Sequence, residues 1–378
     1  MQGEKLQQFP TDVVGLTAAL RLQRDYTLAL YGDLPDFLWE PSRVPYQPVI
    51  NPPLWELAHI AWFAEYFCLR RPQRSPKAPQ LPPSRWSVAD ALFDSANVEH
   101  ASRWINIYPR RDACLAYMRD ILSAVVAALH DSRPDARYRF QLALAHEDMH
   151  AEALAMTLRV LNLPLPDCAP QRATLPAENI DIAFAGGNVL LGDSSGRSFV
   201  FDNEKPENRV KLKPFSISSR VVSATEFAEF QNSDAYHDTR MWSTAGWGWR
   251  EHSLAHPVPV ATAPMAAMHL NCYQAEAYCA AANRRLPTEA EWEFAATQSA
   301  AYRASAGHVW EWTASPFSPY PGFVADAYQE YSAPWFHNHQ VLKGGSFLTH
   351  PRLKYPQYRN FYLPERNDIF AGFRTCAI

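Results

Sequence analysis

The chain has 378 residues, more than one hydrophobic core usually organises, so we expect two domains. Hydrophobic residues make up 47% and charged residues 20%, which excludes an intrinsically disordered chain. The net charge of −4 argues against nucleic-acid binding. No run approaches about 18 consecutive apolar residues, which argues against a membrane-spanning helix. The six cysteines form no CxxC pair, which argues against a disulfide scaffold or a zinc–thiolate site. We expect a cytoplasmic protein, monomer or homodimer, that binds neither nucleic acid nor membrane.

The first half of the chain has the hydrophobic periodicity of helices. The pattern predicts helices over residues 12–32, 53–69, 111–130 and from Pro134 to about 161. The pair Pro52-Pro53 marks the start of the second helix. Such a set predicts a four-helix bundle, with the long connection 70–110 passing over its surface.

The pattern changes after residues 164–177, a proline-rich segment. This segment is the predicted linker between one domain of residues 1–163 and a second of residues 178–378. Beyond it, short apolar runs alternate with turn residues. The predicted strands are 182–184, 188–191, 210–212 and 215–217. Only 224–231 and 273–282 have a helical pattern, so this half is expected to be α+β.

Three histidines are candidate ligands of a metal ion. His146 and His150 are four residues apart on the fourth predicted helix, so both imidazoles lie on one face. His59 lies on the second predicted helix in an apolar, aromatic stretch. Taken singly, His59 also fits a core histidine bonded to a carbonyl, and the pair also fits a structural or solvated face. Both interpretations stay open on these residues alone.

Residues 146–150, HEDMH, also match the H-E-x-x-H signature of zinc proteases, with Glu147 as general base. The metzincin continuation requires a glycine and a histidine where this chain has Ala153 and Met156. Three imidazoles without a carboxylate would instead leave open coordination positions, which suits a ferrous ion that activates oxygen. The zinc metalloprotease stays as an alternative.

Four motifs of the second half occur in order: RLPTEAEWE from Arg285, GHVWEWT from Gly307, LKGGSF from Leu342 and FAGFR from Phe370. Together they resemble the formylglycine-generating-enzyme-like domain, an α+β fold related to C-type lectins. The reactive cysteine pair of the true formylglycine-generating enzymes is not recognisable in this chain. The resemblance therefore implies the fold and not that activity.

In the first half, NPPLWELAHIAWFAEYF and LAHEDMHAEAL resemble the two metal-ligand segments of a DinB-like bundle. The two domains together are similar to the non-haem iron sulfoxide synthases of ergothioneine biosynthesis and to their relatives, the selenoneine synthases. The resemblance implies an O₂-dependent enzyme that joins sulfur or selenium to C2 of the imidazole ring of hercynine. It also implies that Fe(2+) is held by His59, His146 and His150.

Three departures from the sulfur enzymes favour a selenium donor. Members that use γ-glutamylcysteine typically have an acidic residue where this chain has Tyr362. They usually have closely spaced arginines after the second helix, where this chain keeps at most Arg103. They often have Gln before the last ligand, where this chain has Met149. Each departure removes a partner for a charged peptide thiol, and burying a charge without its partner is costly. We expect an uncharged selenosugar as donor, with γ-glutamylcysteine or cysteine and a C–S bond as the alternative.

The resemblance further implies a tyrosine of the second domain that donates to the iron–oxygen species. The candidates are Tyr320, Tyr328 and Tyr331. The trimethylammonium group of hercynine cannot donate a hydrogen bond, so aromatic faces are its natural partners. The candidates are Trp312, Trp335, Phe361 and Tyr362. Asn360 is the candidate for the hercynine carboxylate, and Arg366 is a further substrate candidate. A non-catalytic module that binds a betaine or a sugar is the remaining alternative.

Overall fold

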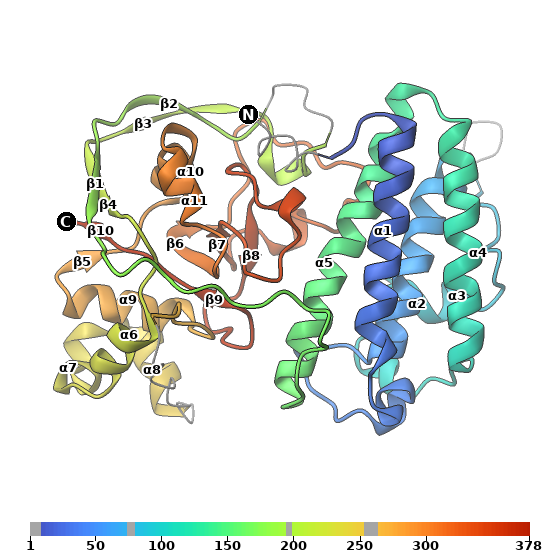
Figure 1. The fold of residues 1–378 in the computed structure, drawn as a ribbon, viewed down its shortest axis with the longest axis horizontal. Coiled ribbons are helices and arrows are strands. Elements are labelled where there is room, and N and C mark those ends of the chain that lie inside the picture. The colour runs from blue at the N-terminus through green and yellow to red at the C-terminus, as the bar shows by residue number, and fades with distance from the viewer. Residues whose placement is uncertain (1–8, 74–79, 194–198, 253–263) are drawn as a thin grey trace. The chain divides into compact units, whose positions relative to one another are not determined.

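The computed structural model describes residues 9–73, 80–193, 199–252 and 264–378. Contacts between Cα atoms divide the chain into two compact units, Met1–Ala169 and Pro170–Ile378. The first unit is helical and the second combines helices with short strands (Figure 1).

The long helices of the first unit lie where the hydrophobic periodicity predicts them. The helices are α1 (Val13–Gly32), α2 (Pro53–Ala64), α3 (Ala89–Phe93), α4 (Arg111–His130) and α5 (Tyr138–Val160). Asp12 caps α1 by accepting a hydrogen bond from the amide of Gly15. Helix α2 continues directly into a π-helical turn, Glu65–Arg70. Short 3₁₀ turns cover Asp36–Trp39, Pro41–Arg43, Arg71–Gln73, Ala101–Trp104 and Pro134–Ala136.

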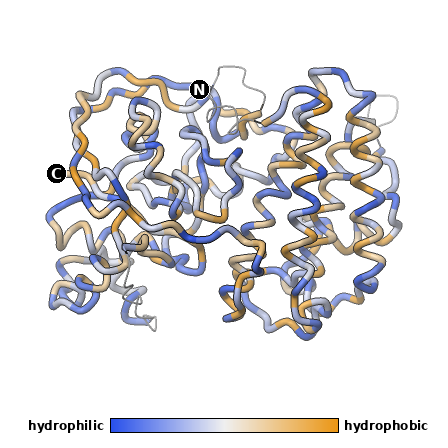
Figure 2. Tube along the Cα trace, viewed as in Figure 1, coloured by the Kyte–Doolittle hydropathy of each residue, from blue (hydrophilic) through white to orange (hydrophobic). Residues whose placement is uncertain are grey.

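Helix α2 is the centre of the first unit. All of its residues are buried, and it packs against α4 and α5. Helix α1 packs against the same two helices. A helix that is apolar all round belongs in the interior, whereas the other long helices alternate hydrophobic and hydrophilic positions along the tube in Figure 2. The polar residues of α2, Glu56 and His59 among them, therefore need partners inside the bundle.

Most described residues of the connection between α2 and α4 are exposed or half-buried, as expected of a connection that passes over the surface, and a few side chains anchor it in the core. Its buried residues include Phe93 at the end of α3 and Trp104. The buried carboxylate of Glu65 anchors it by accepting hydrogen bonds from the Ser84 hydroxyl at 2.7 Å and the Arg85 amide at 2.6 Å. Its prolines interrupt regular helix, but its aromatic rings still gain free energy by leaving water.

A buried ion pair joins three helices of the bundle. The guanidinium of Arg24 on α1 donates to the carboxylate of Glu147 on α5 at 2.7 and 3.0 Å, and to the carbonyl of Met118 on α4 at 2.6 Å. Both charged side chains are nearly inaccessible to water. Such a pair need not add net stability, but either charge left alone in this position is costly.

Among the described residues, α4 is the one helix long and apolar enough to cross a membrane by length and composition. It packs against α1 and α2 within the bundle. The core helix of a bundle passes the same test, so this finding is weak evidence for a membrane span.

The second unit contains short, mostly antiparallel strands. They are β1 (Asp181–Phe184), β2 (Gly187–Leu191), β3 (Asn208–Leu212), β4 (Phe215–Ser218), β5 (Arg284–Arg285), β6 (Trp310–Pro316), β7 (Gln340–Lys343), β8 (Asn360–Tyr362), β9 (Ala371–Gly372) and β10 (Cys376–Ala377). Within the described residues the sheets have the orders β1-β4-β10-β5, β2-β3 and β8-β7-β6-β9, and only β6 and β9 pair in parallel. The strands predicted before residue 218 correspond to β1–β4.

The helices of the second unit are more numerous than the sequence pattern predicts. They are α6 (Ala224–Gln231), α7 (Asp234–His237), α8 (Thr244–His252), α9 (Cys272–Ala281), α10 (Glu289–Gln298) and α11 (Ala300–Ala304), with 3₁₀ turns at Asp202–Glu204, Thr239–Met241, Ala333–Trp335 and Pro351–Leu353. Helices α6 and α9 are the two that were predicted. Helix α10 had a readable start signal, a capping box in which Thr288 and Glu291 exchange hydrogen bonds.

The four sequence motifs of the second half meet in the core of this unit. Glu311 of WEWT accepts hydrogen bonds from Arg374 of FAGFR and from the Trp292 indole of EAEWE, each at 2.7 Å. Lys343 of LKGGSF pairs with Glu293 at 2.9 Å, and both side chains are buried. A Cβ at Gly344, where φ is +92°, would lie 2.9 Å from the Trp292 ring. These motifs therefore specify the fold.

We predict that Arg24→Met lowers the free energy of unfolding by about 3–5 kcal/mol, because it leaves the Glu147 carboxylate buried and uncompensated. Urea unfolding followed by circular dichroism measures the loss. The control is Arg85→Ala, which removes a half-exposed pair with Asp120 and should cost less than about 1 kcal/mol. A double variant, Arg24→Met with Glu147→Leu, should recover most of the stability. Equal losses in Arg24→Met and in the control Arg85→Ala would contradict the prediction.

Candidate metal centre

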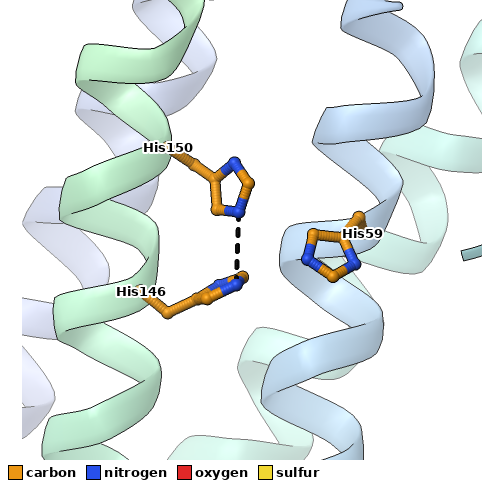
Figure 3. A group of neighbouring side chains, drawn as sticks. All are labelled: His59, His146 and His150. Atoms are coloured by element: carbon orange, nitrogen blue, oxygen red, sulfur yellow. Dashed lines mark hydrogen bonds between the residues drawn. The ribbon is translucent and has the colours of Figure 1, made fainter. Parts of the chain in front are cut away.

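The structure brings the three candidate histidines together. His59 comes from α2 and His146 and His150 come from α5, and one ligand nitrogen from each lies within 4.8 Å of the others (Figure 3). In the described ranges of the chain, no other group of three or more His, Cys, Asp or Glu side chains meets this criterion.

The spacing on α5 explains the geometry of the pair. Residues four apart stand one above the other on a helix, and the two Nε2 atoms face each other at 3.2 Å, the dashed line in Figure 3. The centre of the His59 ring lies 5.1 Å from that of His146 and 5.2 Å from that of His150. The rings of both helices thus converge on one point between them.

Two of the rings are oriented by hydrogen bonds through Nδ1. His59 donates to the carbonyl of Phe93 at 2.8 Å, and His150 donates to the carboxylate of Glu56 at 2.7 Å. A neutral imidazole that donates through Nδ1 has an unprotonated Nε2, which is the form that binds a metal. Both rings therefore present Nε2 toward the shared point, as ligand histidines in metal centres commonly do.

Aromatic rings hold the imidazoles in place. The His146 ring stacks on Phe63 with 3.6 Å between ring centres and an interplanar angle of 3°. The His59 ring stacks on Trp55 at 4.9 Å and 9°. Trp55 is itself fixed, because its indole donates to the carbonyl of Leu92 at 2.6 Å. These contacts restrict the rotamers of the ligands before any metal binds.

Burial keeps the imidazoles neutral. Loss of hydration lowers the pKa of His59 well below its usual value, and the neighbouring His150 lowers it further. Loss of hydration likewise lowers the pKa of His146, and a positive charge on His150 or His59 would lower it further. Both groups are therefore unprotonated near neutral pH, so protons compete weakly with a metal ion.

This donor set fits a transition metal. Imidazole nitrogen is a good ligand for Fe(2+) and for other divalent first-row metals, whereas calcium and magnesium prefer oxygen. Three protein ligands leave coordination positions for reactants. His59, His146 and His150 are the residues that would hold the ion.

Glu147 does not have the environment of a protease general base. Both of its oxygens accept hydrogen bonds from Arg24, and its side chain is buried against α1. Being adjacent to His146 in the helix, it projects about 100° away from the ligand face. The geometry therefore contradicts the role that a zinc protease would assign to Glu147.

The substrate candidates of the first unit have different environments. Arg103 is buried, and its guanidinium donates to the Asn51 side chain at 2.7 Å and to the carbonyls of Ser95 and Val98 at 3.2 Å. It also lies 4.0 Å from the centre of the Trp55 ring. Its hydrogen-bond partners are internal to this unit, and a role in substrate binding stays a prediction. Met149 is half-buried on α5 next to His150.

Two candidates of the second unit are core residues. The Trp312 side chain is fully buried, and its indole donates to the carbonyl of Leu270 at 2.7 Å. The ring of Tyr320 is buried under the guanidinium of Arg359 at 4.1 Å. Packing encloses both rings, so neither presents a free face to a ligand in this unit. The expectation that Trp312 cages a substrate is corrected accordingly.

The other aromatic candidates form one partly exposed cluster beside β8. Its central ring is Phe361, which lies 5.7 Å from Tyr331 and 5.9 Å from His339 between ring centres. Trp335 lies 5.3 Å from His339 and is partly exposed, and Tyr328 lies 5.7 Å from Tyr331. His339 is a member that the sequence did not signal, because it directly precedes β7 and its place depends on the pairing of β7 with β8.

The polar candidates on and after β8 already have internal partners. Asn360 accepts a hydrogen bond from the Phe361 amide through its side-chain oxygen at 2.9 Å. Arg366 forms a two-point ion pair with Asp368, at 2.5 and 2.6 Å, and its guanidinium covers the Tyr362 ring at 5.2 Å. The charge of Arg366 is thus compensated within its own turn.

Two partners of the metal centre were missed in the sequence. Glu56 had a signal, since an acidic residue in an otherwise apolar helix, one turn before His59, calls for a buried partner. The carbonyl of Phe93 had none, because a backbone group acquires its role only when the connection folds onto α2.

Comparisons with known proteins match both halves of the chain. The DinB superfamily model matches residues 19–154, and the sulfatase-modifying factor enzyme 1-like domain matches 167–305 and 301–377. The predicted fold class, a DinB-like bundle followed by a formylglycine-generating-enzyme-like domain, is thereby confirmed.

Whole-chain relatives are found as well. The hercynine oxygenase of Mycolicibacterium smegmatis is 30% identical over 403 residues, covering 87% of this chain and 91% of that protein. The hercynine oxygenase of Mycobacterium tuberculosis is 31% identical over 396 residues, with the same two coverages of 87% and 91%. The formylglycine-generating enzyme of Streptomyces coelicolor is 24% identical over 248 residues, 45% of this chain and 79% of that protein.

We predict that His146→Ala abolishes metal binding while the fold is retained. Loss of a ligand should weaken binding by more than the roughly 10–100-fold that follows loss of an outer-shell partner. Metal analysis after dialysis, with circular dichroism for the fold, tests this. The control is His130→Ala, an exposed histidine at the end of α4. Unchanged metal content in His146→Ala would refute the ligand assignment.

We also predict that the metal-free protein loses stability as the pH falls through about 6.5, the ordinary pKa of histidine. The pKa values of His59 and His146 are lowered in the folded state, so the unfolded chain takes up protons first on acidification. Urea midpoints measured in chelator between about pH 7.5 and pH 5.5 should fall with pH, and fall less steeply in His59→Asn. A midpoint that rises on acidification would contradict this.

Proposed function

This chain belongs to the hercynine oxygenase family, and on that premise we propose that it uses Fe(2+) and O₂ to form a C–Se bond between a selenosugar and C2 of the hercynine imidazole. The protein is an oxidoreductase by family membership. The iron and the selenium donor are our proposals.

The observation that carries the proposal is the group of three oriented imidazoles in the first unit. A ferrous ion, when bound, supplies the capacity to activate O₂ and to stabilise a deprotonated chalcogen at neutral pH. The chain supplies the rest: His59, His146 and His150 hold the ion, and Trp55 and Phe63 keep water from the ligand rings. Neutral ligands preserve the positive charge of the ion, which an anionic reactant needs.

The engagement of the arginines supports an uncharged donor. Arg103 is bound to Asn51 and to carbonyl groups, and Arg366 is bound to Asp368. A peptide thiol with free carboxylates would have to displace these contacts and would pay the desolvation of its own charges. A sugar has hydroxyl groups and no formal charge on its ring, so it avoids both costs.

The aromatic cluster beside β8 supports a quaternary ammonium substrate. Phe361, Tyr331 and Trp335 lie within one region of the second unit, and Trp335 is partly exposed. Phe317 covers one face of Phe361 and Phe201 covers one face of Tyr331, so their other faces and edges are what a ligand could contact. Aromatic faces attract cations that cannot donate hydrogen bonds. Of the tyrosine candidates, Tyr328 and Tyr331 belong to this cluster, whereas Tyr320 lies in the core, so we propose one of the first two as the donor.

Formation of a C–S bond is the second candidate function. The two relatives named hercynine oxygenase, each covered over 91% of its length, favour it. The acceptor is hercynine in both cases, so the two candidates differ only in the chalcogen donor.

A competition between donors tests the proposal. Iron-loaded protein is given hercynine and O₂ with either a selenosugar or γ-glutamylcysteine, and mass spectrometry follows the adducts, with His146→Ala as the control. We expect a selenium adduct from wild type and none from the variant. A sulfur adduct alone would overturn the selenium donor. No consumption of hercynine with either donor would overturn the function.

A further inference from the structure

We infer that Glu56 is the positioning residue of the metal centre: its buried carboxylate holds His150 by Nδ1 and strengthens that ligand toward a divalent ion. The inference rests on the proposed metal site.

Glu56 joins the two helices that carry the ligands. It lies on α2 one turn before His59, and its Oε1 accepts the Nδ1–H of His150 on α5 at 2.7 Å. Helix α2 therefore supplies one ligand itself and orients a ligand of the opposite helix. Any slip of α2 along α5 would move His59 and break the Glu56–His150 bond together, so the register of the helices and the geometry of the site are coupled.

The burial of Glu56 is only partly compensated by the protein. Its side chain is 1% exposed, and its second oxygen, Oε2, has no hydrogen-bond partner among the described residues. The positive charge of Arg103 is close enough to attract the carboxylate, but its one direct hydrogen bond comes from the His150 imidazole. A buried carboxylate with one direct donor keeps part of its desolvation cost.

Two other buried glutamates of the same unit show the contrast. Glu65, which follows α2, accepts hydrogen bonds from Ser84, the Arg85 amide and Tyr117. Glu147 is paired with Arg24. The hydrogen-bond partners of these two carboxylates are groups outside the metal centre. The partner of Glu56 is instead the imidazole of His150, whose other nitrogen, Nε2, faces the candidate metal site.

A divalent ion at that nitrogen completes the compensation. An ion bound to Nε2 draws electron density from the ring, which polarises Nδ1–H and strengthens its bond to the carboxylate. The same bond raises the basicity of Nε2 and hence its strength as a ligand. The desolvation free energy of Glu56 in the metal-free protein is thus offset when the ion binds, which increases the affinity of the site for the ion.

Binding of Co(2+) to the metal-free full chain tests the inference, because the ion reports its coordination by absorption and needs no turnover. Glu56→Gln keeps the shape and an acceptor oxygen but removes the charge. We expect its dissociation constant for Co(2+) to be about 10–100-fold higher than that of wild type, with a shifted visible spectrum. Glu56→Asp, which restores the charge on a shorter side chain, should bind more tightly than Glu56→Gln.

The matched control is Glu65→Gln, which removes a buried charge from the same continuous helical segment but away from the ligands. Its dissociation constant should stay within about twofold of wild type even if its thermal stability falls, as expected of independent sites. Circular dichroism of each variant verifies that the fold is retained.

The outcomes separate the two proposals. Wild-type affinity and spectrum in Glu56→Gln would overturn the role of Glu56, as would an equal loss in Glu65→Gln or an Asp variant no better than the Gln variant. A wild-type chain that binds no Co(2+) would overturn the metal site and the inference together. Weakened binding in Glu56→Gln alongside no product from hercynine would uphold Glu56 and reject the proposed reaction.

Discussion

The first unit is organised by the need to satisfy three imidazoles in a bundle that excludes water. Each ring nitrogen buried there requires a defined partner, since an unpaired polar group in the core is costly. The carbonyl of Phe93 and the carboxylate of Glu56 provide two of these partners. That requirement explains why the connection after α2 brings the Phe93 carbonyl to His59 and why a glutamate lies in the most apolar helix.

The buried charges described above differ in how fully the protein compensates them. Glu311 is compensated by Arg374 and Trp292, and Lys343 by Glu293, so these groups stabilise the fold of the second unit. Glu56 in the first unit is compensated less fully, and it lies beside His150. Its place next to a candidate ligand is what connects this incomplete compensation with a metal ion.

Regular, local signals were predicted well. The helix bounds of α1 and α4, the start of α2 at Pro53 and the pairing of His146 with His150 all follow from spacing along one chain segment. Helix α10 was not predicted although Thr288 and Glu291 form a capping box, because most of its residues are buried and it lacks the one-sided apolar pattern of a surface helix. Residues 80–110 lie mostly at the surface as predicted, but the burial of Phe93 and Trp104 was not predicted, since composition does not reveal which surface a ring will cover.

The sequence by itself determined the helical periodicity of the first unit, the ligand pair on one face of α5 and the family, because each depends on residues close in the chain or on the order of motifs. The resemblance already implied that His59 joins that pair, and the structure brings the three rings together. Only the tertiary structure decided that Glu147 turns to Arg24 and that Glu56 reaches His150. It also decided that Trp312 and Tyr320 are core rings and that Arg103 and Arg366 are already paired. The physical reason is that hydrogen-bond satisfaction is settled between elements, and partners distant in the chain meet only after the helices and strands have packed.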